Sequence, residues 1–105
     1  GDMTPAKSAP SLPHGLEHYR TSSEFTETTV PKSLLIAHRT KAGVWGLLRV
    51  AQGRLRFCLD AAPLQAIVVE QGSTAVIEPE ALHHVEFLDA GTRFLIEFHR
   101  RAGAA

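Results

Sequence analysis

From Phe25 onwards the chain is a succession of short apolar or alternating stretches, each closed by turn-forming residues such as glycine, proline or aspartate. No window of about eleven residues in this part follows the 3.6-residue period of an amphipathic helix. We expect strands at 25–30, 33–39, 44–52, 54–60, 65–70, 74–78, 82–88 and 92–99. Short strands at this near-regular spacing predict an all-β sandwich or barrel.

The length and charge of the chain limit its organisation and its partners. A chain of 105 residues is long enough for one domain. We expect residues 1–11 to be disordered, 12–100 to form the domain and 101–105 to be frayed, with residues 12–19 forming a helical turn or a surface arm. Eleven basic residues balance eleven acidic ones, so the net charge is zero. This balance predicts no nucleic-acid or membrane partner.

The N-terminal residues also lack the basic and then apolar pattern of a signal peptide. No apolar run approaches the roughly 20 residues of a membrane span. We therefore expect a cytoplasmic protein.

Residue parity assigns the side chains of each expected strand to two faces. In the strand 54–60 one face is apolar, and the other carries Arg54, Arg56, Cys58 and Asp60. In the last strand one face carries Phe94, Ile96 and Phe98, and the other carries Arg93, Leu95, Glu97 and His99. This alternation predicts one buried and one solvated face for each strand.

Two of the six histidines continue apolar faces: His38 follows Ile36, and His83 precedes Val85. A neutral imidazole is a good ligand for divalent transition metals. Each histidine could equally be a hydrogen-bonded core residue. His84 has the opposite parity to His83, so we expect it at the surface or rim. The other three histidines are also expected to be exposed: His14, His18 and His99.

Three further residues have two interpretations each. Glu97 is either an outward carboxylate paired with an arginine or the third ligand of a two-histidine, one-carboxylate metal site. Cys58, the only cysteine, is either a catalytic nucleophile or a buried, unreactive thiol, and the lack of an identifiable base favours the thiol without a catalytic role. Trp45 is a single aromatic residue, and we expect it to wall the core or a pocket.

The segment from Gly72 to His83 resembles the second conserved motif of the cupins, and His38 and Gly53 match the first motif more loosely. The usual second histidine and glutamate of that first motif are missing between Thr40 and Gly46. The chain is most similar to small cupins that resemble the N-terminal domain of tellurite-resistance protein B. That similarity is carried by the segments 19–26, 29–31, 38–46, 48–53, 79–85 and 94–98.

The resemblance implies a cupin double-stranded β-helix, or jelly-roll barrel, whose interior holds a divalent metal ion or a small molecule. It implies His38 and His83 as metal ligands, with Glu97 as a third. We expect Zn, Fe, Ni or Mn as the metal, and Trp45 and Phe57 as walls of the pocket. Relatives with the tellurite-resistance name carry an additional methyltransferase domain, for which this chain has no room.

Three functions are compatible with these features. The first is a metal-binding cupin, with or without catalysis on a small molecule or a role in tellurite or oxyanion stress. The second is a non-catalytic module that binds or senses a small molecule or an oxyanion. The third is a structural or interaction protein whose histidines are core residues without metal. We also expect a homodimer, formed through a patch of spare apolar residues at Val44, Leu88 and Leu95.

Overall fold

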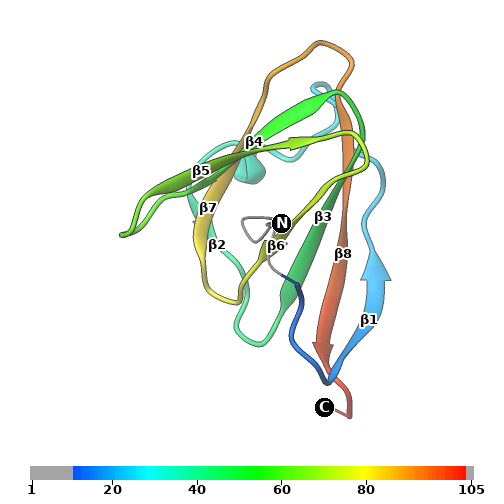
Figure 1. Cartoon of the computed structure of the whole chain (residues 1–105), viewed down its shortest axis with the longest axis vertical. Helices are drawn as coiled ribbons and strands as arrows, with labels where there is room; N and C mark the ends of the chain where they lie inside the picture. The colour runs from blue at the N-terminus through cyan, green and yellow to red at the C-terminus, as the bar shows by residue number, and fades with distance from the viewer. Residues whose placement is uncertain (1–10, 104–105) are drawn as a thin grey trace, which may run out of the picture.

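The computed structural model describes residues 11–103. Within them lie one short 3-10 helix and the strands labelled in Figure 1. In chain order the elements are β1 (Leu16–Thr21), η1 (Lys32–Leu34), β2 (His38–Arg39), β3 (Trp45–Gln52), β4 (Arg54–Leu59), β5 (Gln65–Glu70), β6 (Thr74–Ile77), β7 (Leu82–Phe87) and β8 (Arg93–Arg101). Of the segments expected to be disordered or frayed, residues 1–10 and 104–105 lie outside the described residues, and Arg101 is the last residue of β8.

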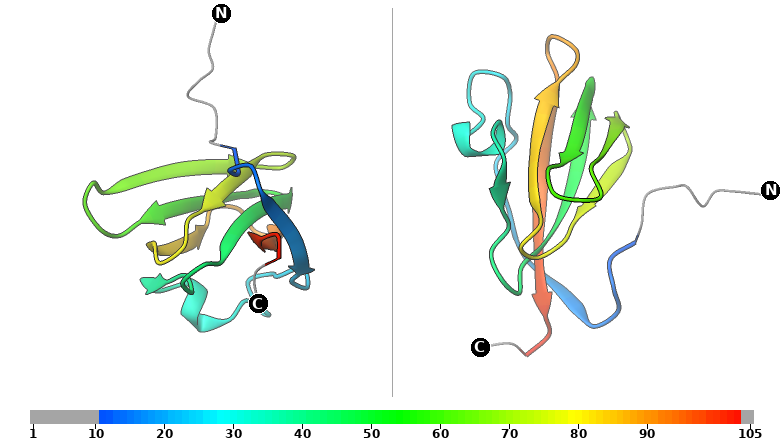
Figure 2. Two further views of the ribbon diagram at one scale, coloured as in Figure 1. Left: turned by 90° about the horizontal axis from the view of Figure 1, so that it is seen from below. Right: turned by 90° about the vertical axis from the view of Figure 1, so that its left-hand side faces the viewer.

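The strands form two four-stranded sheets, with the orders β1-β8-β3-β6 and β2-β7-β4-β5. Every pairing in both sheets is antiparallel. The two sheets face each other, and η1 lies against β7 (Figure 2). The all-β prediction is confirmed. The closed barrel is not, because in the part of the chain described here no ladder joins β1 to β2 or β5 to β6.

One expected strand is absent, a second is reduced to two residues, and one strand was not expected. Residues 25–30 form a turn in which the Thr29 hydroxyl accepts a hydrogen bond from the backbone N–H of Thr26, and only Phe25 bridges to β8. Threonine side chains that bond nearby backbone groups compete with sheet pairing. Residues 33–39 are divided between η1 and the two-residue β2. Strand β1 was not expected because its sequence shows no alternation of apolar and polar residues. None of its residues is buried.

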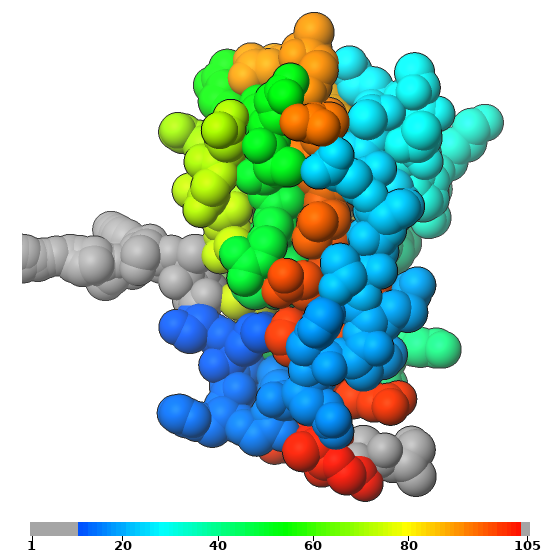
Figure 3. All heavy atoms as spheres, turned by 90° about the vertical axis from the view of Figure 1, so that its right-hand side faces the viewer, coloured from blue at the N-terminus to red at the C-terminus, as the bar shows by residue number. Residues whose placement is uncertain are grey.

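The core lies between the sheets and is built from the inward parity of the longer strands. Its buried residues are Leu48, Val50, Leu55, Phe57, Val69, Ala75, Ile77, Val85, Phe94 and Ile96. On the opposite face of the first sheet β8 and β3 run side by side (Figure 3), and there Arg49 and Arg93 are exposed while Leu47 and Leu95 are half-buried. The inward parity expected for β4 and β8 is therefore correct, and it directs one face of each sheet towards a shared interior.

The exposed large apolar residues do not lie at the patch that we expected to form a homodimer. Val44, Leu88 and Leu95 are each half-buried. The large apolar residues that are exposed are Tyr19, Leu35, Ile36, Leu64, Ile67 and Val68. In the described part of the chain, no helix has the length and apolar character needed to cross a membrane.

Candidate functional site

His38 and His83 lie directly opposite each other where β2 pairs with β7. Their ring centroids are 4.5 Å apart. His83 is 2% exposed, and its ring centroid lies 5.6 Å from that of the buried Phe57. The fold therefore brings two imidazoles from distant parts of the sequence together at the inner face of one sheet.

Backbone carbonyls orient both rings. Nδ1 of His83 lies 2.9 Å from the Ala81 carbonyl oxygen, and Nδ1 of His38 lies 3.3 Å from that of Ile36. A carbonyl oxygen only accepts, so each Nδ1 donates, and Nε2 of the neutral ring keeps its lone pair. Metal-ligating histidines are commonly held in this way through their second nitrogen.

Burial favours the neutral form of His83. Removal of the ring from water lowers the pKa of His83, and the nearby His38 acts in the same direction. The hydrogen bond to the Ala81 carbonyl opposes this lowering. A neutral imidazole is the form that binds a metal ion.

Both rings line a pocket of about 620 Å³ that opens between the sheets. Its charged lining residues are Arg20, Arg39 and Lys41, and the described residues contribute no carboxylate to it. Hydroxyl groups come from Tyr19, Ser22, Ser23, Ser33 and Thr40. The Thr40 hydroxyl is buried, and residues 11–103 offer it no hydrogen-bond partner. This surface is suited to a ligand that carries negative charge and accepts hydrogen bonds.

The structure does not bring Glu97 to the two histidines. On β8 it has the parity opposite to Ile96 and Phe98, which line the pocket. Its carboxylate accepts a hydrogen bond of 2.9 Å from Nε of Arg49 on the neighbouring strand β3. Of the two arrangements considered for Glu97 from the sequence, this is the outward one paired with an arginine.

The two aromatic residues expected at the pocket differ in position. Phe57 is buried beside His83 but does not line the pocket. Trp45 pairs with His99 in the β3–β8 ladder and is also absent from the lining. Trp45 directly precedes the pocket residue Gly46 on β3, so the Trp45 side chain extends to the face of the strand that points away from the pocket.

His14 and His18 are exposed, as expected. His99 is not. Its side chain is 13% exposed, and its buried Nε2 has no hydrogen-bond partner in the described part of the chain. The ring of His18 lies against it, with centroids 5.3 Å apart. Burial lowers the pKa of His99, and His18 adds to this effect. Pairing between β1 and β8 explains the difference, because β1 was not expected.

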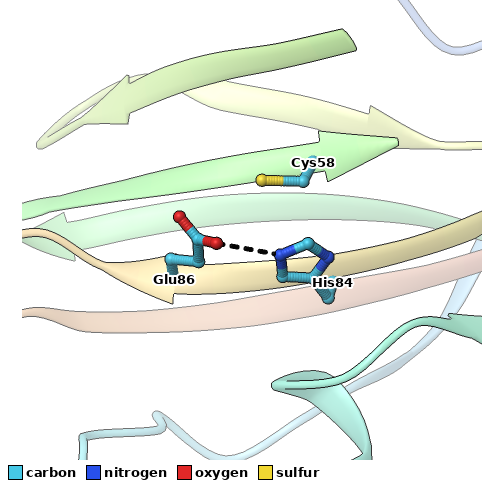
Figure 4. A group of neighbouring side chains, drawn as sticks. All are labelled: Cys58, His84 and Glu86. Atoms are coloured by element: carbon cyan, nitrogen blue, oxygen red, sulfur yellow. Dashed lines mark hydrogen bonds and ion pairs between the residues drawn. The ribbon is translucent and has the colours of Figure 1, made fainter. Parts of the chain in front are cut away.

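A second cluster lies on the outer face of the other sheet and consists of Cys58, His84 and Glu86 (Figure 4). One candidate ligand atom from each lies within 4.8 Å of the others. Nδ1 of His84 donates to Asp60 at 2.6 Å, and Nε2 lies 3.1 Å from Glu86 Oε2. Residue parity predicted outward positions for Cys58 and His84. It did not predict that they lie side by side, because no local sequence pattern indicates how β4 is aligned with β7.

The ionisation of this cluster follows from its contacts. The hydrogen bond to Asp60, and then that to Glu86, raises the pKa of His84. Burial raises the pKa of the Cys58 thiol, and the nearby carboxylates add to this. Arg56 donates to the second oxygen of Glu86 at 2.7 Å. These contacts favour the charged form of the imidazole between two carboxylates and the protonated form of the thiol.

Comparison with known proteins identifies relatives along most of the chain. The TehB-like domain model matches residues 20–96. The protein YeaR of Escherichia coli (strain K12) is 30% identical over 95 residues, which cover 83% of this chain and 80% of that protein.

Two solved structures are similar in fold. A crystal structure of a protein from E. coli (strain K12) superposes with a TM-score of 0.80 at 27% identity, covering 88% of this chain and 97% of that one. TehB from Haemophilus influenzae gives a TM-score of 0.75 at 26% identity, covering 84% of this chain and 32% of that one. The region matched by the family model includes the histidine pair and the Cys58 cluster, whereas Glu97 lies just beyond it.

Proposed function

The chain belongs to the TehB-like domain family, and from the geometry of its pocket we propose that it binds a divalent metal ion through His38 and His83. The observation that carries this proposal is the pair of imidazole rings whose centroids are 4.5 Å apart, each with Nδ1 directed to a backbone carbonyl. The donor set fits a metal of the Zn, Fe, Ni or Mn class, because neutral imidazole nitrogens are ligands for all of them. Two protein ligands leave coordination positions for water or a bound anion.

The ligand that accompanies the metal is, in this proposal, a small oxyanion. The charged lining of the pocket is entirely cationic among the described residues, with Arg20, Arg39 and Lys41 around the two histidines. The buried Thr40 hydroxyl, which has no hydrogen-bond partner among the described residues, adds a further donor. A metal at the histidine pair would supply Lewis-acid chemistry to such a ligand. Tellurite is the probe suggested by the resemblance to tellurite-resistance proteins.

The strand order supports a jelly roll related to the cupins. Pairing of β1 with β8, β2 with β7, β3 with β6 and β4 with β5 is that of one long antiparallel hairpin folded into two sheets. A double-sheet jelly roll of eight strands has this arrangement. In this proposal the pocket lies at the open end of the roll, where β2 and β7 pair.

Equilibrium dialysis against Co²⁺ tests the metal site. All variants carry Cys58→Ser, so that the Cys58 cluster does not contribute to the count. We expect one Co²⁺ per chain, reduced at least tenfold in affinity by His38→Ala or His83→Ala. His14→Ala, which removes an exposed histidine outside the pocket, is the matched control and retains the ion. Equal Co²⁺ content in folded His83→Ala and control proteins would contradict the proposal.

Calorimetric titration with tellurite tests the anion. Lys41→Gln is expected to weaken binding several-fold. Lys32→Gln removes another exposed lysine, which does not line the pocket, and should leave the affinity unchanged. Equal losses in both variants would indicate nonspecific attraction and would contradict an oxyanion site in the pocket.

A further inference from the structure

The outer face of the sheet β2-β7-β4-β5 carries a set of side chains that the pocket does not use. We propose that Cys58, His84 and Glu86 form a second metal site, selective for a borderline-soft divalent cation of the zinc type. The three candidate ligand atoms lie within 4.8 Å of one another (Figure 4). A thiolate, an imidazole and a carboxylate are the ligand types that zinc takes in proteins.

The β4–β7 ladder sets the spacing of the ligands. Cys58 pairs directly with His84, and Arg56 pairs with Glu86, so the three ligands share one face of two hydrogen-bonded strands. With metal–ligand distances of about 2.0–2.3 Å, two ligand atoms on a tetrahedral zinc ion lie roughly 3.3–3.8 Å apart. Nε2 of His84 and Oε2 of Glu86 are already 3.1 Å apart. Small side-chain rotations would therefore complete the site on a fixed backbone.

The residues around the ligands provide the supporting contacts of a metal site. Asp60 accepts the Nδ1–H of His84 at 2.6 Å, which directs Nε2 towards Glu86 and Cys58. A carboxylate that holds a ligating histidine in this way fixes the orientation of the ring and raises its basicity. Arg56 binds Oε1 of Glu86 and leaves Oε2 on the side of the histidine. Asp60 is thus a positioning residue, and Arg56 balances part of the negative charge.

Zinc binds the neutral imidazole and the thiolate, so metal binding would release the Cys58 thiol proton and any proton on His84 Nε2 to solvent. Cys58 is buried, whereas the Glu86 side chain is 46% exposed, so the cluster is open to solvent on the carboxylate side. Three protein ligands leave a fourth position for water or another exogenous ligand.

This site is independent of the histidine pocket. His83 and His84 are successive residues of β7 and extend to opposite faces of the sheet. A metal ion at the Cys58 cluster would have a thiolate ligand, whereas no cysteine lines the histidine pocket. Since Cys58 is the only cysteine of the chain, a thiolate signal from a bound metal identifies this site alone.

Absorption spectroscopy with Co²⁺ as the probe tests the proposal. We expect the folded wild-type protein to develop a near-ultraviolet thiolate-to-cobalt charge-transfer band whose final amplitude corresponds to one thiolate-bound Co²⁺ per chain and which is reversed by Zn²⁺. Cys58→Ser should abolish the band, and His84→Gln should weaken Co²⁺ binding at least tenfold. Asp60→Asn should retain the band with about 10–100-fold lower affinity.

The controls separate this site from the pocket and from general changes in charge. His83→Ala should leave the band unchanged, since it alters only the pocket. Asp89→Asn removes a carboxylate that pairs with Arg54 much as Glu86 pairs with Arg56, but it lies outside the cluster, and it should also leave the band unchanged. Absence of the band in folded wild-type protein at saturating Co²⁺ would overturn the proposal. Loss of Co²⁺ from the pocket in His83→Ala, with the band intact, would support both sites separately.

Discussion

His83 and His84 are adjacent in the sequence, but β7 directs them into opposite environments. His83 is 2% exposed, and its ring lies between those of Phe57 and His38. His84 lies on the other face, with one ring nitrogen against Asp60 and the other against Glu86. Burial lowers the pKa of the first, and hydrogen bonds to carboxylates raise the pKa of the second. The two residues should therefore affect the pH dependence of folding in opposite senses.

For His83 we predict a loss of stability on acidification. Its folded pKa lies below the value of about 6.5 that it has in the unfolded chain. Between these two values the unfolded chain binds more protons, so the free energy of unfolding falls as the pH is lowered through about 6.5. Urea unfolding of metal-free protein at a series of pH values should show a smaller acid loss for His83→Gln than for wild type. Parallel curves for the two proteins would contradict this prediction.

For His84 we predict the reverse. Its folded pKa is raised, so its stabilising contribution is complete below about pH 6.5 and is lost as the pH rises through the folded pKa. The difference in unfolding free energy between wild type and His84→Gln should be largest in acid and should shrink towards alkaline pH. Asp60→Asn serves as the control, because it removes the largest cause of the raised pKa and should reduce the same difference. A difference that grows with pH would show that the imidazolium is not stabilised by its carboxylates.

A third prediction concerns Glu97. Its carboxylate pairs with the half-exposed Arg49 on the outer face of the first sheet, away from His38 and His83. We expect Glu97→Gln to leave Co²⁺ binding in the pocket unchanged and to alter the free energy of unfolding by less than about 1 kcal/mol, as for other exposed ion pairs. Equilibrium dialysis and urea unfolding measure these effects. A marked loss of metal from this variant would restore Glu97 as a ligand.

The sequence of a single strand predicts which way its side chains face, whereas contacts between strands depend on how the strands are aligned. Parity along one strand directs His83 inwards and His84 outwards, because side chains alternate at every residue. The partnership of His38 with His83 depends on the register between two strands far apart in the chain, and the same is true of Cys58 with His84. Local patterns do not encode that register, so the Cys58 cluster was missed. Strand β1 was missed because neither of its faces is buried.

The last prediction concerns the turn between β3 and β4, where Gly53 has a φ of +79°. A Cβ at this position would collide with the side chain of Thr92 and come within 2.9 Å of its Cα. Thr92 is fully buried, and its hydroxyl accepts from the Arg54 N–H and donates to the Asp89 carbonyl, so it is not free to move. Gly53→Ala should therefore lower the free energy of unfolding by about 2–4 kcal/mol, combining left-handed backbone strain with overpacking.

Gly72→Ala provides the matched control for this turn. Gly72 has a φ of +85°, and a Cβ there would meet nothing within 4 Å. It should lower the free energy of unfolding by only about 1–2 kcal/mol, the cost of the left-handed backbone conformation alone. Urea unfolding of both variants under identical conditions isolates the contribution of the contact with Thr92. Equal destabilisation by the two substitutions would mean that Thr92 moves aside, and that the close packing of this turn contributes nothing to the requirement for glycine.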